Sequence, residues 1–344
     1  MDFLSFFIIC VKVLLVFAGT LLAVLIMVYA ERRVSAFMQG RLGPNRVGPQ
    51  GLLQPIADGI KFLMKEDIIP DGVNKPIYLL APVIMLIPAL MTFAVIPFGS
   101  TITLFDRDII LQVADVNIGI LYILALTSIG VYGIVLAGWA SNSKYTLIGG
   151  LRSSAQLISY ELALGLSVVS IILMSGSLRL NDIVADQQGY FLSWYVFKQP
   201  LAFLIFLIAT YAETNRLPFD LAEAEQELVG GYHTEYSSMK FAMFFMSEYA
   251  NMITAAALTV TLFFGGWDVP LLDEKSLGIW GAMLSVVSFI LKMGFFLFLF
   301  IWIRWTFPRF RYDQLMKLGW KVLLPLSLIN IFITGGYLTL AALI

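Results

Sequence analysis

The sequence predicts an all-α, polytopic membrane protein with about eight transmembrane helices and one amphipathic helix at the cytoplasmic surface. Hydrophobic residues make up 59% of the 344 positions and charged residues only 13%, whereas a soluble domain carries about 25% charge. The mean hydropathy is +0.86. The apolar residues also gather in runs of about 20, the length that a helix needs to span a bilayer.

Eight apolar runs are candidates for spanning helices, and together they form one transmembrane domain over residues 1–344. The fifth run is short, and it needs residues 191–197 to reach full length. The spans are expected near residues 6–30, 77–99, 116–139, 156–176, 199–213, 241–265, 282–303 and 323–343.

Lysine and arginine predict the orientation. Sixteen of the 22 basic residues lie in the loops 31–75, 140–155, 214–240 and 304–322, and four lie in the three opposite loops. Because basic loops stay on the cytoplasmic side, both termini are expected on the periplasmic side of a bacterial inner membrane. The mitochondrial inner membrane is the alternative location.

The first cytoplasmic loop contains turn residues and then a short helix. Residues 40–51 are rich in Gly and Pro but lack the Gly-Lys-Ser/Thr of a nucleotide-phosphate loop. From Gln54 to Lys65, polar and apolar residues fall on opposite faces of a helix. This helix either lies in the membrane interface or docks on the helical bundle as an ordinary surface helix.

An acidic stretch, AETNRLPFDLAEAEQE at residues 212–227, follows the fifth span. Pro218 disfavours helix at the residue before it, so the incoming helix should end near Asn215, and a new helix can begin at Pro218. So much negative charge beside a span indicates traffic of protons or cations, and a solvated acidic loop is the alternative. On the new helix three carboxylates would share one face: Asp220, Glu223 and Glu227.

Five charged residues lie within the apolar runs. Lys12 is near the edge of its run, where its side chain can reach the interface. The other four are Glu161, Glu213, Glu248 and Lys292. Each charge at the centre of a lone helix costs about 2.5–3.5 kcal/mol unless it faces another polar group or water. With a rise of 1.5 Å per residue, the three carboxylates lie in the cytoplasmic half of three spans, and Lys292 lies near mid-depth. Carboxylates at matching depth indicate a proton path. The alternative is a structural ion pair, for example between Lys292 and one glutamate.

Single residues exclude several kinds of redox centre. One cysteine, Cys10, rules out an internal disulfide and a cysteine-ligated iron–sulfur cluster, and one histidine, His233, rules out a bis-histidine haem. His233 reads as a loop residue rather than a ligand. The net charge of −1 gives no indication of nucleic-acid binding.

Several short motifs together resemble the H subunit of the proton-pumping NADH:quinone oxidoreductases, or respiratory complex I, whose mitochondrial counterpart is NADH dehydrogenase subunit 1. The resemblance covers every cytoplasmic loop and the inner halves of most spans. Besides residues 212–227, the motifs are ERR at 31–33, GPNRVGP at 43–49, GLLQP at 51–55, SAQ at 154–156, ISYE at 158–161, FFMSEY at 244–249 and PRFRYDQL at 308–315.

The resemblance implies a membrane subunit without a redox centre of its own, with quinone (ubiquinone or menaquinone) as substrate. Its partners would be the quinone-site peripheral-arm subunits, including the terminal iron–sulfur subunit, and the small and antiporter-like membrane subunits. The residues implied for the quinone chamber are Glu31, Arg32, Arg41, Arg46, Asp58, Lys61, Arg216 and Arg304. Those implied for proton transfer and coupling are Glu161, Glu213, Asp220, Glu223, Glu225, Glu227 and Glu248, to which the depth argument adds Lys292.

Three other functions remain open at this point. The chain could be the homologous subunit of a membrane-bound hydrogenase or of a ferredoxin-dependent complex. It could also be a passive membrane anchor for the peripheral arm, in which case apolar residues would replace the buried glutamates without effect. An independent ion transporter is disfavoured because no internal repeat is visible.

Overall fold

The computed structural model describes residues 3–104, 107–220, 230–270, 272 and 277–343. This part of the chain is helical except for turns and one small hairpin, which confirms the predicted all-α class. It contains seven helices that are long and apolar enough to cross a membrane, and an eighth apolar helix, α8 (Pro200–Glu213), that is shorter. The protein is therefore a multi-pass membrane protein.

The long helices are α1 (Phe3–Met38), α3 (Lys75–Met91), α4 (Gly119–Ala140), α5 (Lys144–Ser175), α9 (Ser238–Phe263) and α10 (Ile279–Thr306). The seventh combines α11 (Tyr312–Lys317), a π-helical segment η6 (Leu318–Leu323) and α12 (Leu324–Leu343). Shorter helices are α2 (Gln54–Met64), α6 (Leu180–Asp186) and α7 (Tyr195–Lys198), with 3-10 turns η1 (Pro49–Gly51), η2 (Thr92–Val95), η3 (Phe191–Ser193) and η4 (Gly231–His233).

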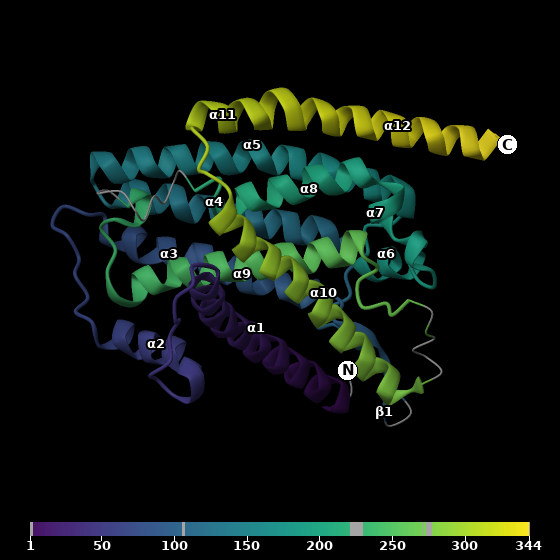
Figure 1. The fold of residues 1–344 in the computed structure, drawn as a ribbon, viewed down its shortest axis with the longest axis horizontal. Helices are drawn as coiled ribbons and strands as arrows, with labels where there is room; N and C mark the ends of the chain where they lie inside the picture. Colours follow the sequence, from purple (N-terminus) through teal and green to yellow (C-terminus); the bar gives the residue numbers. More distant parts are fainter. Residues whose placement is uncertain (1–2, 105–106, 221–229, 271, 273–276, 344) are drawn as a thin grey trace.

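The helices form a bundle with two inclined helices on one side (Figure 1). Helices α3, α4, α5, α8 and α9 run alongside one another, and α12 extends along α5. Helices α1 and α10 cross this bundle at an angle and contact α9. The amphipathic helix α2 stands apart at one end, where it touches α1 and α9.

Two helices extend beyond the apolar runs that predicted them. Helix α1 continues to Met38, so the Glu31-Arg32-Arg33 motif lies within the helix. Helix α5 begins at Lys144, twelve residues before the apolar run. This added length packs tightly on α4, because a Cβ placed on Gly138 would lie 2.7 Å from the carbonyl oxygen of Thr146. Apolar composition therefore marks the lipid-embedded part of these helices and underestimates their full length.

The fifth predicted span is interrupted. Residues 191–198 form the separate turns η3 and α7, and α8 begins at Pro200, which has no N–H to continue a preceding helix. Helix α8 ends at Glu213, two residues before Asn215, near which the helix was predicted to end. Asn215 then adopts a left-handed backbone conformation with φ of 49°, as expected just beyond a helix C-terminus.

A β-hairpin, which was not predicted, lies between η2 and α4. Strands β1 (Gly99–Leu104) and β2 (Arg107–Leu111) pair antiparallel, with Ile102 opposite Ile109. The hairpin is tied to α10, because the N–H of Ser100 donates to the hydroxyl of Ser285 at 2.9 Å. The available signal was two short runs of β-branched residues, at 101–103 and 109–110.

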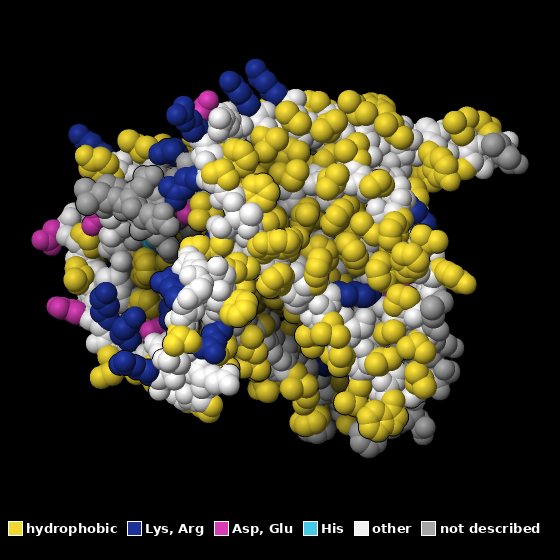
Figure 2. Space-filling model, viewed as in Figure 1, with side chains coloured by type: hydrophobic (Ala, Val, Ile, Leu, Met, Phe, Trp, Pro, Cys, Tyr) yellow, Lys and Arg dark blue, Asp and Glu magenta, His cyan; other side chains and the backbone are white. Residues whose placement is uncertain are grey.

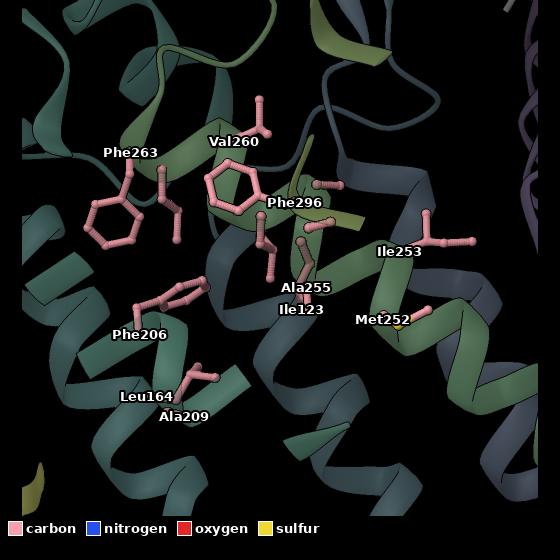
Figure 3. Close-up of a cluster of buried hydrophobic side chains, with 14 of the residues drawn as sticks. Ile123, Leu164, Phe206, Ala209, Met252, Ile253, Ala255, Val260, Phe263 and Phe296 are labelled. Atoms are coloured by element: carbon pink, nitrogen blue, oxygen red, sulfur yellow. The ribbon is translucent and has the colours of Figure 1, made fainter. Parts of the chain in front are cut away.

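The largest buried cluster lies where α4, α5, α8, α9 and α10 meet. Within it the rings of Phe206 and Phe263 lie 5.4 Å apart. Lipid tails are as apolar as this cluster, so close packing and hydrogen bonds between helices, such as that of Thr92 with Thr254 at 3.0 Å, hold the bundle together. Figure 3 labels ten of its members: Ile123, Leu164, Phe206, Ala209, Met252, Ile253, Ala255, Val260, Phe263 and Phe296.

The surface is divided between charged and apolar regions (Figure 2). Lysine and arginine side chains gather at the end of the bundle that carries α2 and α11, and hydrophobic side chains cover most of the rest of the face in view. The basic loops that predicted the orientation thus lie together at one end, and both chain termini lie away from it.

Candidate functional site

A cavity of about 760 Å³ lies between α1, α2, α9 and α10, next to the charged end of the bundle. This volume is within the range of about 300–1,000 Å³ that is typical of small-molecule sites. Its walls are largely apolar, with Val24 and Val28 from α1, Phe62 from α2, and Phe245 and Met246 from α9. We call it the α1/α2/α9/α10 pocket.

A buried carboxylate, Glu31, lies in the wall of this pocket and gathers three partners from other segments. Arg304 of α10 forms an ion pair with it, and Nη1 of Arg216 lies 3.3 Å from its Oε1. The hydroxyl of Tyr249 on α9 donates to its Oε2 at 2.7 Å. A carboxylate so removed from water needs such partners, because leaving a buried charge unpaired costs several kcal/mol.

Arg216 links Glu31 to a second buried carboxylate. Its Nη2 lies 3.8 Å from Oε2 of Glu248 on α9, and its guanidinium lies 4.4 Å from the ring centroid of Tyr249. One cation thus stands between two carboxylates from different helices. A change of charge or position at Arg216 would act on both.

The helix end before Arg216 holds it in place. The buried side chain of Gln156 on α5 donates from Nε2 to the carbonyl oxygens of Ala212 at 2.9 Å and of Phe219 at 3.0 Å. Asn215 donates to the hydroxyl of Ser153 at 3.3 Å. Gln156 of the SAQ motif therefore satisfies a carbonyl in the last turn of α8 and another beyond Arg216, and so fixes the segment that carries Arg216.

Charged residues on α1 and α2 lie at the mouth of the pocket. Arg32 forms an ion pair with Asp58, and Lys61 lies 3.4 Å from the same carboxylate. Partial burial alone would raise the pKa of Asp58, but the hydrogen bond and charge of Arg32 outweigh this effect, and the net pKa is lowered. Asp58 is therefore ionised at neutral pH and holds α2 against α1.

A second, water-sized cavity of about 20 Å³ lies deeper, among α4, α5, α8 and α9. Glu213 lines it together with Thr127 and Asn251. One water needs about 10–15 Å³ of such volume and two to four polar partners, which this cavity offers. Asn251 is three residues beyond Glu248 on α9, so it lies on the same side of that helix, one turn further into the bundle.

Glu161 completes this line of carboxylates. It projects from α5 and accepts a hydrogen bond from Ser128 on α4. Its charge interacts with that of Glu213, so the two carboxylates are electrostatic neighbours. The three glutamates that the depth argument grouped therefore lie on facing helices, with Glu213 between Glu161 and the Glu248 side of α9.

The remaining predicted residues are distributed differently. Arg41 lines the α1/α2/α9/α10 pocket, while Arg46 is exposed in the loop and is not among the lining residues described. Asp220 lies 3.2 Å from Arg309. The predicted helix does not begin at Pro218, which lies in a turn. Three predicted carboxylates lie outside the described residues: Glu223, Glu225 and Glu227.

Lys292 does not belong to the carboxylate line among the residues described. Its ammonium group donates to the carbonyl oxygens of Phe264, Gly266 and Asp268 at 2.8, 3.1 and 2.7 Å, just beyond the C-terminus of α9. It also lies 4.5 Å from the ring centroid of Trp194. A lysine that satisfies helix-end carbonyls is stabilised there by the helix dipole as well.

Sequence reasoning missed two groups that the site uses. Tyr249 donates to Glu31, and Asn251 lines the small cavity. Both belong to the EYAN run that begins at Glu248, so helical spacing from that glutamate was the signal available. Among the described residues, no group of three or more His, Cys, Asp or Glu side chains could hold a metal ion.

Comparison with known proteins identifies the family of this chain. The family model described as NADH dehydrogenase matches residues 11–335. The chain is 57% identical to the NADH-quinone oxidoreductase H subunit 1 of Geobacter sulfurreducens and 58% identical to the H subunit 2 of Geobacter metallireducens, each over 94% of this chain and 93% of the relative. It is 54% identical to the H subunit 2 of Koribacter versatilis over 96% of both chains. The chain therefore belongs to the NADH dehydrogenase family, that of the H subunits of NADH-quinone oxidoreductase.

Proposed function

We propose that this chain is the membrane subunit of an NADH:quinone oxidoreductase that holds quinone in the α1/α2/α9/α10 pocket and couples its reduction to proton translocation. The observation that carries the proposal is the buried Glu31–Arg216–Glu248 cluster beside an apolar cavity. The chain contributes no redox centre to the reaction. It acts as part of a proton-translocating oxidoreductase, with other subunits of that complex as partners.

The pocket suits a ligand with a polar head and an apolar tail. Val24, Val28 and Met246 offer an apolar surface for the tail, and charged side chains, among them Arg216 and Arg304, line the same cavity. Arg216 and Arg304 there would stabilise the negative charge that quinone acquires on reduction. Electrons would come from an iron–sulfur centre in a peripheral-arm partner.

The coupling step starts from the shared cation. Negative charge on the reduced quinone competes with Glu31 and Glu248 for Arg216, so one carboxylate becomes under-neutralised and takes up a proton. Asn251 and the water-sized cavity then lead from Glu248 to Glu213, and Glu161 follows. The small and antiporter-like membrane subunits would receive the charge beyond Glu161.

In this arrangement the charged end of the bundle faces the cytoplasm and contacts the quinone-site subunits of the peripheral arm. Both termini then lie on the periplasmic side of a bacterial inner membrane. The loop 40–53 and α2 carry the basic residues nearest the pocket mouth, which suits contact with a partner that completes the chamber.

Filling the pocket tests the proposal. Val24→Phe adds bulk to a buried wall residue, and Val287→Phe adds the same bulk at a half-exposed, lipid-facing position of α10. In membranes that contain the assembled complex, Val24→Phe should raise the KM for quinone at least about tenfold, since overpacking costs about 1–3 kcal/mol. Val287→Phe should leave KM unchanged. Equal KM values in both variants would refute quinone binding in this pocket.

A further inference from the structure

Helix α2 forms one wall of the pocket but stands apart from the bundle (Figure 1). Asp58, Phe62 and Leu63 line the cavity, while Ile56 and Ile60 on another face are about half exposed. The Arg32–Asp58 ion pair holds the helix against α1. Whatever fixes the other end of α2 therefore sets the distance between this wall and the opposite wall on α9.

Two serines at the start of α9 fix that other end. The hydroxyl of Ser238 donates to the carbonyl oxygen of Phe62 at 2.8 Å. The hydroxyl of Ser237 accepts from the N–H of Ile68 at 2.9 Å and lies 3.3 Å from the carbonyl oxygen of the same residue. We call this pair the serine clasp. It joins the first turn of α9 to the last turn of α2 and to the segment that follows α2.

The backbone at the clasp is strained. Ser238 has a φ of 55°, in the left-handed region that residues with a side chain rarely adopt. Such a conformation persists only where its surroundings impose it, and it often marks a functional position. Here the surroundings are a 4.1 Å ring stack of Tyr78 on Tyr236 and an ion pair of Lys240 with Asp67 at 2.8 Å.

Packed aromatic rings also connect η4 and α9 to α2. The buried imidazole of His233 in η4 lies 5.3 Å from the ring of Phe241, which in turn lies 6.1 Å from the ring of Phe62 on α2. Phe241 and Phe62 both line the pocket. The first turn of α9 therefore contacts the α2 wall through both the hydrogen bond of Ser238 and the packed ring of Phe241.

We propose that Ser238 is a positioning residue that sets the separation of the α2 and α9 walls and thereby the affinity of the pocket for quinone. The inference rests on the proposed function, because it requires quinone to occupy this pocket. Ser238 acts through the position of α2, since its hydroxyl is bound to the backbone of Phe62. Ser237 supports it by holding the segment after α2.

Three variants of the assembled complex test the clasp. Ser238→Gly removes the hydroxyl and keeps the left-handed backbone without strain. Ser238→Asn also tolerates that backbone, and its amide can donate to the same carbonyl. Thr259→Val removes a hydroxyl whose hydrogen bond, to Ala255, lies within α9 itself. The readouts are hydrogen exchange of the amides of residues 54–64 and steady-state kinetics with a short-chain quinone.

Ser238→Gly should raise both the exchange rate of α2 and the KM for quinone about fivefold, the factor that one hydrogen bond of about 1 kcal/mol corresponds to. The value of kcat should change much less. Ser238→Asn should restore both quantities, and Thr259→Val should leave both at wild-type values. Unchanged exchange of α2 in Ser238→Gly would overturn the clasp. Faster exchange with unchanged KM would refute the positioning role of Ser238 if Val24→Phe raises KM, and would refute quinone in this pocket if Val24→Phe leaves KM unchanged as well.

Discussion

The hydroxyl of Tyr249 offers the smallest perturbation of the charged cluster. Tyr249→Phe removes the 2.7 Å hydrogen bond to Glu31 but keeps the ring that packs against Arg216. A hydrogen bond to a charged group contributes about 1.5–3 kcal/mol. Because Glu31 keeps its ion pairs with Arg304 and Arg216, we expect the lower value, about 1.5 kcal/mol. That corresponds to an approximately tenfold loss of quinone-dependent turnover.

The assay compares two activities in the same membranes. NADH oxidation with quinone should fall about tenfold, while NADH oxidation with a water-soluble acceptor, which does not use this pocket, should remain at the wild-type level. Tyr211→Phe is the matched control, because that buried hydroxyl has no hydrogen-bond partner within the described structure. Equal quinone turnover in Tyr249→Phe and Tyr211→Phe would refute the role of the Glu31 cluster.

Two further predictions concern protons. Glu213→Gln should lower proton translocation at least about tenfold, since positioned proton-transfer groups contribute about 10²–10⁴-fold. Pumping is measured by pH changes in inverted vesicles, and Asp182→Asn, at an exposed position, serves as the control. Pumping at the wild-type rate in Glu213→Gln would contradict a proton path through Glu213. Burial lowers the pKa of His233 to about 4, below the ordinary value of 6.5. Below pH 6.5 the unfolded segment therefore binds more protons than the folded one. The folded state of this segment loses stability as pH falls from 6.5 toward 4. The opening constant of residues 230–240, obtained from hydrogen exchange after correction for the intrinsic exchange rate at each pH, should therefore rise about tenfold at pH 5.5 relative to pH 7.5 in wild type, but not in His233→Asn. The same pH dependence in both proteins would refute the role of His233.

Position along the chain was predictable, and position around a helix was not. Counting residues from the cytoplasmic ends placed Glu161, Glu213 and Glu248 at similar depth, and the structure brings them onto facing helices. The same counting placed Lys292 near mid-depth, and it was therefore grouped with these glutamates. Its long side chain instead reaches the carbonyls beyond α9, because α10 crosses the bundle at an angle. Depth in a span therefore does not determine partners when helices are inclined.

The pocket itself was predictable only through the resemblance. No pattern in the sequence indicates that α1, α2, α9 and α10 enclose a cavity, because the pair α1 and α2 is far from the pair α9 and α10 in the chain. The partners of Glu31 come from positions 216, 249 and 304, at separations that only tertiary packing can bring together. The hairpin at 99–111 was within reach of pattern analysis, but it lies between two strong helical signals.

The position of Arg216 explains why the apolar pocket and the carboxylate line must be neighbours. A cation shared between two carboxylates, at 3.3 Å from Glu31 and 3.8 Å from Glu248, needs little energy to favour one over the other. At an effective dielectric constant of about 20, a new unit charge at about 4 Å changes the local energy by about 4 kcal/mol, enough to shift such a balance almost completely. If the pocket lay one helical turn further from Arg216, this change in energy would be roughly halved. Coupling therefore requires a ligand whose charge changes within contact distance of this guanidinium.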